Sequence, residues 1–236
     1  CMGDDFKPEM TAGHSLGEFS ALVAAGALSF EDGLKLVYAR AMAMQKACEA
    51  TPSTMAAIIA LPDEKVEEIC AAVNAEGEVC VPANYNCPGQ IVISGKTEAV
   101  AEAGEKLKEA GAKRVLPLKV SGPFHSKMLV GAGEKLGKVL DTVEIHTPEI
   151  PYIANVTADY VTDAADVKPL LMKQVSSSVR WEQTIRKMLA DGVDTFIEIG
   201  PGKTLTGFMR KIDKNAKAFN IEKLEDIDKV KEALGC

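Results

Sequence analysis

Hydrophobic positions at helical spacing dominate the first fifth of the chain. The run of Ala and Leu over residues 16–27 predicts a buried helix that ends at Gly26. A second helix is expected over residues 30–49, and Arg40 lies on the flank of its apolar stripe. The positions that we expect to form this stripe are Leu34, Val37, Tyr38, Ala41, Gln45 and Cys48. The chain is therefore predicted to begin with two helices, the second of which carries a cation beside its apolar face.

The pattern changes at Met55, where short apolar runs begin to alternate with amphipathic segments. Strands are expected at residues 55–61, 78–86, 90–95 and 113–120, and helices at 62–77 and 97–111. The first of these helices is expected to close at Gly77. The resulting order, β-α-β-β-α-β, is that of the ferredoxin-like unit. We therefore expect residues 53–120 to form a small ferredoxin-like domain that is inserted into a larger one.

The last third of the chain alternates between helical and strand patterns. Its expected elements are helices at 127–141 and 181–191, strands at 150–156 and 194–200, and a helix from Thr204. Such alternation favours an α/β domain with helices packed on a mostly parallel sheet. The predicted architecture is a discontinuous large α/β domain of residues 1–52 and 121–236, interrupted by the small domain.

Composition and charge narrow the class of protein. The 236 residues are 47% hydrophobic and 26% charged, as in an ordinary globular protein. No apolar run approaches the ~20 residues that cross a bilayer, and the first ten residues lack the basic and apolar regions of a signal peptide. The formal net charge of −7 argues against general binding to nucleic acid, which needs a basic surface. We therefore expect a cytoplasmic protein with no membrane partner and no nucleic-acid partner.

One short segment departs from this acidic balance. Between residues 203 and 217, five cations stand against the single acid Asp213, namely Lys203, Arg210, Lys211, Lys214 and Lys217. An acidic partner could dock on such a cluster, and a solvated helix face would carry the same residues. Charge alone leaves both interpretations open.

The six cysteines do not indicate a metal site. They form no C-x-x-C pair and do not cluster with the three histidines, so neither a metal site nor a redox motif is predicted. The four inner cysteines are expected to be free thiols: Cys48, Cys70, Cys80 and Cys87. The roles of Cys1 and Cys236, at the two ends, stay open.

The sequence Gly-His-Ser-Leu-Gly at residues 13–17 matches G-x-S-x-G, the pattern of a nucleophile elbow. In that turn the flanking glycines allow a strained backbone to expose the serine, here Ser15, and the Leu16 N–H can face a developing oxyanion. The same window also fits the S-x-x-E capping box, in which Ser15 and Glu18 would only satisfy backbone donors at the start of a helix. These residues alone favour neither interpretation.

A serine nucleophile needs a base, and His125 is the candidate. It follows a predicted strand and the turn formers Ser121-Gly122-Pro123, so it could lean over a site from a loop or could lie at the surface. We interpret His14 as structural, because its side chain should point away from that of its neighbour, and His146 as part of an exposed loop.

Arg40 also has two interpretations. Its planar guanidinium could bind a substrate carboxylate through two parallel hydrogen bonds. It could instead extend its charged end into solvent from the edge of the apolar stripe.

Seven blocks of sequence together resemble one family. They are "GHSLGEFSALVAAG", Arg40 at 25 residues after Ser15, "ANYNCPGQIVISG", "VSGPFHSKM", "ANVTA", "KQVSSSVRW" and "EIGPGKTLTG". In this order they resemble the malonyl-CoA:acyl carrier protein transacylases of type II fatty acid synthesis and the related acyltransferase domains of polyketide synthases. The resemblance covers residues 12–211 and implies an α/β-hydrolase-like large domain with a ferredoxin-like insertion.

The resemblance also implies a role for each candidate residue. The residue that matches Ser15 carries the malonyl group, and the one that matches His125 is first a base and then an acid. The residue that matches Arg40 holds the malonate carboxylate, and the main-chain carbonyl at Gln174 orients the histidine. The sequence Phe124-His125-Ser126 is similar to that of malonyl-selective members. Malonyl-CoA is then a substrate, acyl carrier protein is the partner, and no cofactor or metal is implied.

One departure from the family pattern limits this expectation. The family begins upstream of the nucleophile with a strand and a G-Q-G-x-Q loop whose glutamine helps form the oxyanion hole, whereas this sequence has 14 residues before Ser15. We expect one oxyanion donor to be missing, which can cost ~10²–10³ in rate, and core surface to be exposed. Such a surface would allow self-association. A thioesterase or esterase that uses Ser15, and an inactive binding fragment of the same fold, stay open as alternatives.

Overall fold

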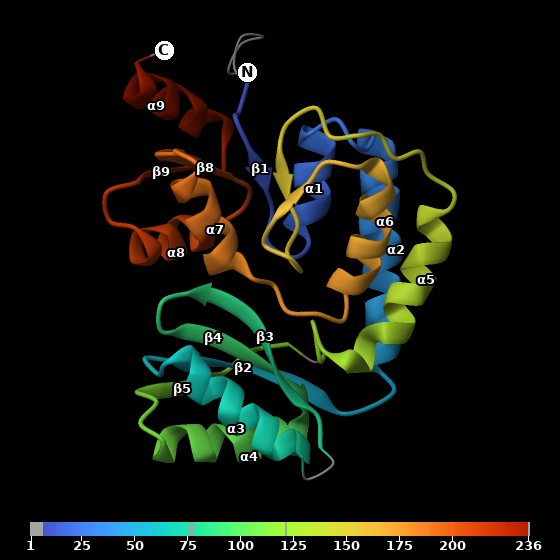
Figure 1. Ribbon diagram of the computed structural model, residues 1–236, viewed down its shortest axis with the longest axis vertical. Coiled ribbons are helices and arrows are strands. Elements are labelled where there is room, and N and C mark those ends of the chain that lie inside the picture. Colours follow the sequence, from blue (N-terminus) through green and yellow to red (C-terminus); the bar gives the residue numbers. More distant parts are fainter. Residues whose placement is uncertain (1–6, 76–77, 121, 236) are drawn as a thin grey trace.

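The computed structural model describes residues 7–75, 78–120 and 122–235, which form two units stacked along the long axis of the molecule (Figure 1). Four residues named in the sequence analysis lie outside the described residues, namely Cys1, Gly77, Ser121 and Cys236. The chain passes from the first unit into the second after α2 and returns after β5. The two units therefore meet around the residues that follow β5, including His125.

The smaller unit is a four-stranded antiparallel sheet with two helices on one face (Figure 1). Its elements in chain order are β2 (Ser53–Ile59), α3 (Asp63–Ala75), β3 (Cys80–Cys87), β4 (Gln90–Lys96), α4 (Thr97–Glu109) and β5 (Arg114–Pro117). This is the predicted β-α-β-β-α-β order. The strands lie side by side in the order β3-β4-β2-β5, with β2 paired to β4 and β5 and β3 paired to β4.

Both faces of the small sheet are covered. Ala56 and Ile58 of β2 pack in the core that α3 and α4 complete. The alternate residues Met55 and Ala57 face the other side, where Phe124 of the larger unit packs against them. Because side chains alternate along a strand, a sheet covered on both faces needs a nearly continuous apolar strand, as in "MAAII".

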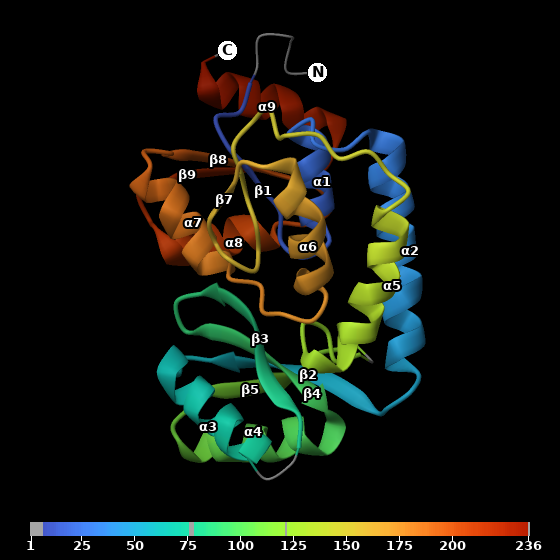
Figure 2. The same cartoon turned by 45° about the vertical axis from the view of Figure 1, so that its right-hand side comes forward.

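The larger unit has a layer of helices on one side. These are α1 (Gly17–Ala24), α2 (Phe30–Cys48), the short 3₁₀ helix η1 (Lys127–Leu129), α5 (Val130–Leu140) and α6 (Ala164–Gln174). Helices α2 and α5 lie side by side in both views (Figures 1 and 2). The core shared by the helices of this layer includes five side chains without solvent exposure, namely Phe19, Leu22, Leu36, Leu136 and Leu171.

The predicted apolar stripe of α2 is wrong. The buried face of this helix consists of Gly33, Leu36, Arg40, Ala43 and Met44, whereas Leu34 and Tyr38 are 62% and 68% exposed. The helix is rotated toward Gly33 because α1 approaches closely there: a Cβ on Gly33 would lie 2.5 Å from Val23 Cγ2. Arg40 consequently lies in the middle of the buried face and not on its flank.

The other side of the larger unit holds two small sheets. In the first, β1 (Thr11–Ala12) pairs parallel with β6 (Tyr152–Ile153), and β6 pairs antiparallel with β7 (Tyr160–Val161). In the second, β8 (Thr195–Ile199) pairs parallel with β9 (Lys217–Ile221). The helices around the second sheet are α7 (Trp181–Ala190), α8 (Thr204–Ile212) and α9 (Leu224–Leu234).

The expected mostly parallel sheet is therefore corrected to two separate sheets, one mixed and one parallel, within the described residues. The strand expected at 150–156 shrinks to two residues because the chain turns at Ala154, whose carbonyl accepts a hydrogen bond from the Ala158 N–H. Ala158 has a left-handed backbone, with φ of 52°. Three elements were not predicted: α6, which contains Pro169, and β9 and α9. A proline lacks the amide donor of a helix interior, so Pro169 argued against a helix at α6.

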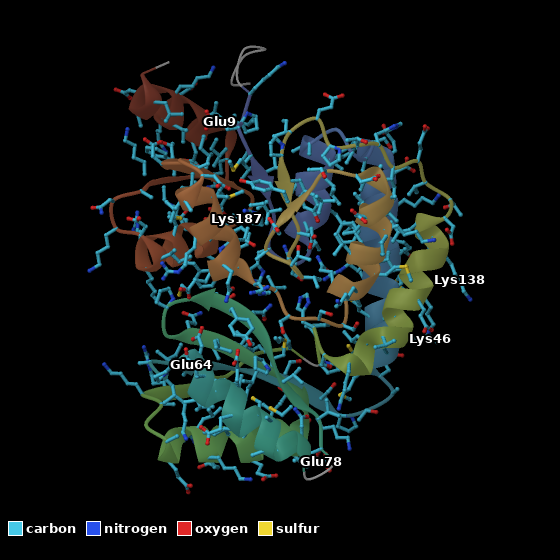
Figure 3. The ribbon with its side chains drawn as sticks, viewed as in Figure 1. Glu9, Lys46, Glu64, Glu78, Lys138 and Lys187 are labelled. Carbon is cyan, nitrogen blue, oxygen red and sulfur yellow. The ribbon has the colours of Figure 1, made fainter. Side chains whose placement is uncertain are left out.

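The charged side chains of Lys46, Lys138 and Glu64 lie on the outside of the two units (Figure 3), whereas those of Glu18 and Arg40 are buried. Among the helices of the described residues, none is both long enough and apolar enough to cross a membrane. In the same residues, no three side chains of His, Cys, Asp or Glu gather as a metal site would require. The inner cysteines Cys48, Cys70, Cys80 and Cys87 are free thiols.

Candidate active site

Ser15 lies in a tight turn between β1 and α1, and its backbone is left-handed, with φ of 54°. That conformation is uncommon for any residue but glycine and costs ~1–3 kcal/mol. Gly13 makes the turn possible, because a Cβ there would lie 1.9 Å from the Gly17 carbonyl oxygen. Gly17 itself has open space around it. The geometry is that of the predicted elbow, and only the first of its two glycines is required by close contact.

Two side-chain amides hold the strained turn in place. Asn155 Oδ1 accepts a hydrogen bond from the Ser15 N–H at 2.7 Å, and Asn155 Nδ2 donates to the Gly13 carbonyl at 2.7 Å. Gln174 Nε2 donates to the Ser15 carbonyl, also at 2.7 Å. These bonds offset the backbone strain and leave the Ser15 hydroxyl facing the cavity. The sequence did not single out Asn155, although it stands in the "ANVTA" block.

The structure brings His125 to Ser15. Their Nε2 and Oγ atoms are 2.8 Å apart, although 110 positions separate them in the sequence. His125 Nδ1 donates to the main-chain carbonyls of Gln174 at 2.9 Å and Ser177 at 3.1 Å. With its proton on Nδ1, the ring presents an unprotonated Nε2 that can accept the serine proton. His125 also has a left-handed backbone, with φ of 59°.

His125 is neutral in its resting state. Burial, followed by the nearby Arg40 charge, lowers its pKa from 6.5 to about 3, and the carbonyls that accept from Nδ1 only partly oppose this shift. A base must be unprotonated before the reaction, so this environment keeps His125 available at neutral pH. Among the described residues no carboxylate bonds to the ring, since the two acceptors of Nδ1 are main-chain carbonyls.

Arg40 extends from α2 to the same serine. Its Nη2 donates to Ser15 Oγ at 2.9 Å and to Gln174 Oε1 at 3.2 Å. Burial lowers its pKa to about 10, which still leaves the guanidinium charged at neutral pH. Within the described residues Nη1 forms no hydrogen bond, so Arg40 keeps free donors beside the nucleophile.

Glu18 does not form the capping box that the S-x-x-E pattern allowed. It is fully buried, and its carboxylate accepts hydrogen bonds from Tyr152 Oη, from Asn155 N at 3.2 Å and from Gln174 Nε2 at 2.7 Å. Burial raises the pKa of Glu18 to about 7, against the lowering effect of these donors and of Arg40. Helix α1 has no side-chain cap. The sequence did not indicate this buried polar network, because its members come from four distant segments.

Ser15, Arg40 and His125 line one cavity of about 830 Å³ between the two units. Met44, Met55 and Phe124 supply an apolar wall. The cavity can therefore hold an acyl chain or its carrier beside a serine, a neutral histidine and a cation.

The remaining candidates lie around this cavity. The Leu16 N–H has no acceptor among the described residues and stays available to an oxyanion. His14 also lines the cavity, and its ring packs at 5.6 Å from that of Trp181 while Nε2 lies 2.9 Å from Asn86 Oδ1. His146 lies in an exposed loop, as expected. The five cations between residues 203 and 217 are all exposed, which is compatible with both interpretations of that cluster.

The fold and the site define an α/β protein with a serine–histidine pair and a buried arginine in one cavity. Residues 1–228 match the acyl transferase domain family. The chain belongs to this family.

Individual relatives are similar over almost the whole chain. The malonyl CoA-acyl carrier protein transacylase of Bacillus subtilis (strain 168) is 49% identical over 221 residues, which are 94% of this chain and 70% of the relative. The crystal structure of an acyl carrier protein S-malonyltransferase from Vibrio cholerae O1 biovar eltor str. N16961 matches with a TM-score of 0.92 and 44% identity, over 95% of this chain and 73% of that one. A malonyl-transacylase solved in complex with its type II polyketide acyl-carrier protein, PlMCAT with AntF, matches with a TM-score of 0.93 and 38% identity, over 97% and 74%. The chain thus has the α/β fold of these structures.

Lowering the pH should destabilise the fold through His125. Its folded pKa of about 3 lies below the ordinary value of 6.5, so between these pH values the unfolded chain takes up a proton that the folded chain does not. This contribution to stability is complete above pH 6.5 and is lost as the pH falls, by on the order of 2 kcal/mol at pH 5. The raised pKa of Glu18 acts in the opposite direction over the same range, so the loss due to His125 is the difference between the wild-type protein and His125→Asn in their change of stability, measured by urea unfolding near pH 7.5 and pH 5. An equal change in both proteins would contradict the buried neutral histidine.

Proposed function

We propose that this chain transfers the malonyl group from malonyl-CoA to the phosphopantetheine thiol of an acyl carrier protein, in fatty acid synthesis. One observation carries the proposal: Ser15 Oγ is within hydrogen-bond distance of both a neutral histidine and a charged arginine. The names of the relatives support the same activity, since they are malonyl transacylases that act on acyl carrier proteins. The exposed cations of the 203–217 segment offer a surface for an acidic partner.

The proposed organisation places this chemistry between two domains. Residues 1–52 and 121–236 form an α/β-hydrolase-like catalytic domain, and residues 53–120 form a ferredoxin-like insertion. The strand order β3-β4-β2-β5 and the two helices on one face support the second assignment. The strand-to-helix turn at Ser15 supports the first.

The first half of the reaction acylates Ser15. His125 Nε2 takes the hydroxyl proton as Oγ attacks the thioester carbonyl, and the Leu16 N–H donates to the oxyanion that forms. The carbonyl then re-forms, the C–S bond breaks, and the CoA sulfur leaves with the proton that His125 returns. The Gln174 and Ser177 carbonyls stabilise the imidazolium between these two proton transfers.

The second half repeats these steps in reverse. The carrier thiol gives its proton to His125 and attacks the malonyl-serine ester, and His125 then returns the proton to Ser15 Oγ. The scheme uses only the side chains and backbone of this chain and its two substrates. Arg40 holds the malonyl carboxylate throughout and so selects diacid thioesters, with Phe124 in the adjoining wall.

Incubation with malonyl-CoA should add one malonyl group to the protein at Ser15. Intact-mass and peptide mass spectrometry measure the adduct, which should be absent in Ser15→Ala and unchanged in Ser20→Ala, an exposed serine of α1. Adding acyl carrier protein that bears its phosphopantetheine should move the group to the carrier. Release of free malonate faster than this transfer would identify a thioesterase instead. Carrier binding without any adduct would identify a binding protein.

Arg40→Ala should lower kcat/KM for malonyl-CoA by about 10²-fold, because it removes a charged hydrogen-bonding partner of the carboxylate. Acetyl-CoA lacks that carboxylate, so its kcat/KM should change far less. Arg40→Lys should not restore malonyl selectivity, since a lysine cannot form two parallel bonds. Lys46→Ala, at an exposed position of the same helix, is the matched control. Equal losses of kcat/KM for both thioesters would show that Arg40 does not bind the malonyl carboxylate.

Self-association, which the sequence led us to expect through exposed core surface, is the third part of the proposal, and the structure offers one exposed apolar surface for it. The outer face of α2 carries Phe30, Leu34, Tyr38 and Met42 at four-residue spacing, each at least 49% exposed. We propose that this stripe packs against the same stripe of a second copy, since a two-fold contact buries one apolar surface against itself. Sedimentation velocity should show a dimer that Leu34→Glu dissociates and Lys46→Glu does not. A monomer across the accessible concentration range would rule the contact out.

A further inference from the structure

Glu18 has no part in the scheme above, yet it is among the most enclosed charged groups of the described residues. It lies one helical turn after Ser15 and is fully buried. Its Oε1 accepts from Tyr152 Oη and the Asn155 N–H, and its Oε2 accepts from Gln174 Nε2 at 2.7 Å. The Glu18 carboxylate thus gives each of the three donors around it an acceptor. Glu18 therefore determines which neighbouring atoms must be donors.

The side-chain amide of Gln174 is the neighbour that matters for the site. Its Nε2 donates both to Glu18 Oε2 and to the Ser15 carbonyl, each at 2.7 Å. Its Oε1 accepts from Arg40 Nη2 at 3.2 Å. A reversed amide would place an oxygen against two acceptors and an NH₂ group against the arginine donor, so all three bonds would fail. The orientation of one amide thus decides whether Arg40 has a buried acceptor.

The arrangement connects a buried anion to a buried cation through one neutral amide. Glu18 pulls the Nε2 end of Gln174 toward itself, which leaves Oε1 to hold Arg40 Nη2 beside Ser15 Oγ. In a buried region such bonds are stronger than in water and strengthen one another. The charge of Arg40 lowers the pKa of Glu18 and that of Glu18 raises the pKa of Arg40, in each case against the effect of burial.

We infer that Glu18 is a positioning residue that, through the amide of Gln174, fixes the guanidinium of Arg40 in the orientation that receives the carboxylate of the acyl group. This inference rests on the proposed function. Glu18 itself does not line the cavity, so it acts on the substrate only through Arg40. Its effect should therefore appear in the choice between malonyl and acetyl thioesters and not in the chemistry at Ser15.

The test is Glu18→Gln, which keeps the shape of the side chain and replaces one acceptor with a donor. An oxygen kept toward Tyr152 Oη and the backbone Asn155 N–H retains two hydrogen bonds rather than one, so the new NH₂ group faces the Gln174 NH₂ group. Relief then requires Gln174 to reverse and release Arg40. The ratio of Ser15 acylation rates from malonyl-CoA and acetyl-CoA, followed by quenching and intact-mass measurement, should fall about tenfold. In an Arg40→Ala background, Glu18→Gln should not change this ratio further, because the residue through which it acts is absent.

Two further variants keep the test decisive. Tyr152→Phe removes a different donor to Glu18 without altering the polarity at Gln174, so it should lower the unfolding temperature and keep the malonyl preference. If Glu18→Gln does not fold, Gln174→Met removes the same connection and should lower the ratio in the same Arg40-dependent way.

The outcomes separate this inference from the proposed function. A wild-type protein that forms no malonyl adduct would overturn both. A wild-type protein that prefers malonyl, together with a Glu18→Gln variant that keeps the preference, would overturn the role of Glu18 alone. So would a loss of preference that is equally large in the Arg40→Ala background.

Discussion

The hydrogen bond between Ser15 Oγ and His125 Nε2 is the interaction on which the rest of the site depends. Both residues have left-handed backbones, which cost ~1–3 kcal/mol each. The fold must hold these two strained positions close together although they come from distant parts of the chain. Most of the polar contacts between α1, α6 and the Ala154 turn can be understood as the means of doing so.

Side-chain amides provide this support. Asn155 bonds to both sides of the Ser15 turn, and Gln174 bonds to its carbonyl. Gln174 also offers its main-chain carbonyl to His125, so the end of α6 positions the base and the nucleophile at once. Because these groups are buried, each needs a partner, and Glu18, Tyr152 and Arg40 supply most of them, although Arg40 Nε has none among the described residues. The small unit contributes Met55 and Asn84 to the cavity wall from the other side.

Much of this could be predicted from the sequence, in particular where local signals are strong. The G-x-S-x-G pattern indicated the elbow, and alternating apolar runs with clear turn residues gave the element order of the small unit. The wrong stripe on α2 shows the limit of periodicity: apolar residues lie on two faces of that helix, and only the close approach at Gly33 decides which is buried. The sequence pattern assigned Glu18 only to a capping box and did not indicate Asn155, because the partners of both side chains around the Ser15 turn are more than 130 positions away in the chain. No local pattern records such contacts.

To act as the base for Ser15, His125 must be neutral, with its proton on Nδ1, while it bonds to the serine. Nitrogen NMR of the protein labelled with ¹⁵N at histidine measures this directly, since the shifts of the two ring nitrogens report both protonation and tautomer. We expect a neutral ring with Nδ1–H that does not titrate until the pH is well below the ordinary histidine pKa of 6.5. A ring that titrates near pH 6.5, or one with its proton on Nε2, would contradict it.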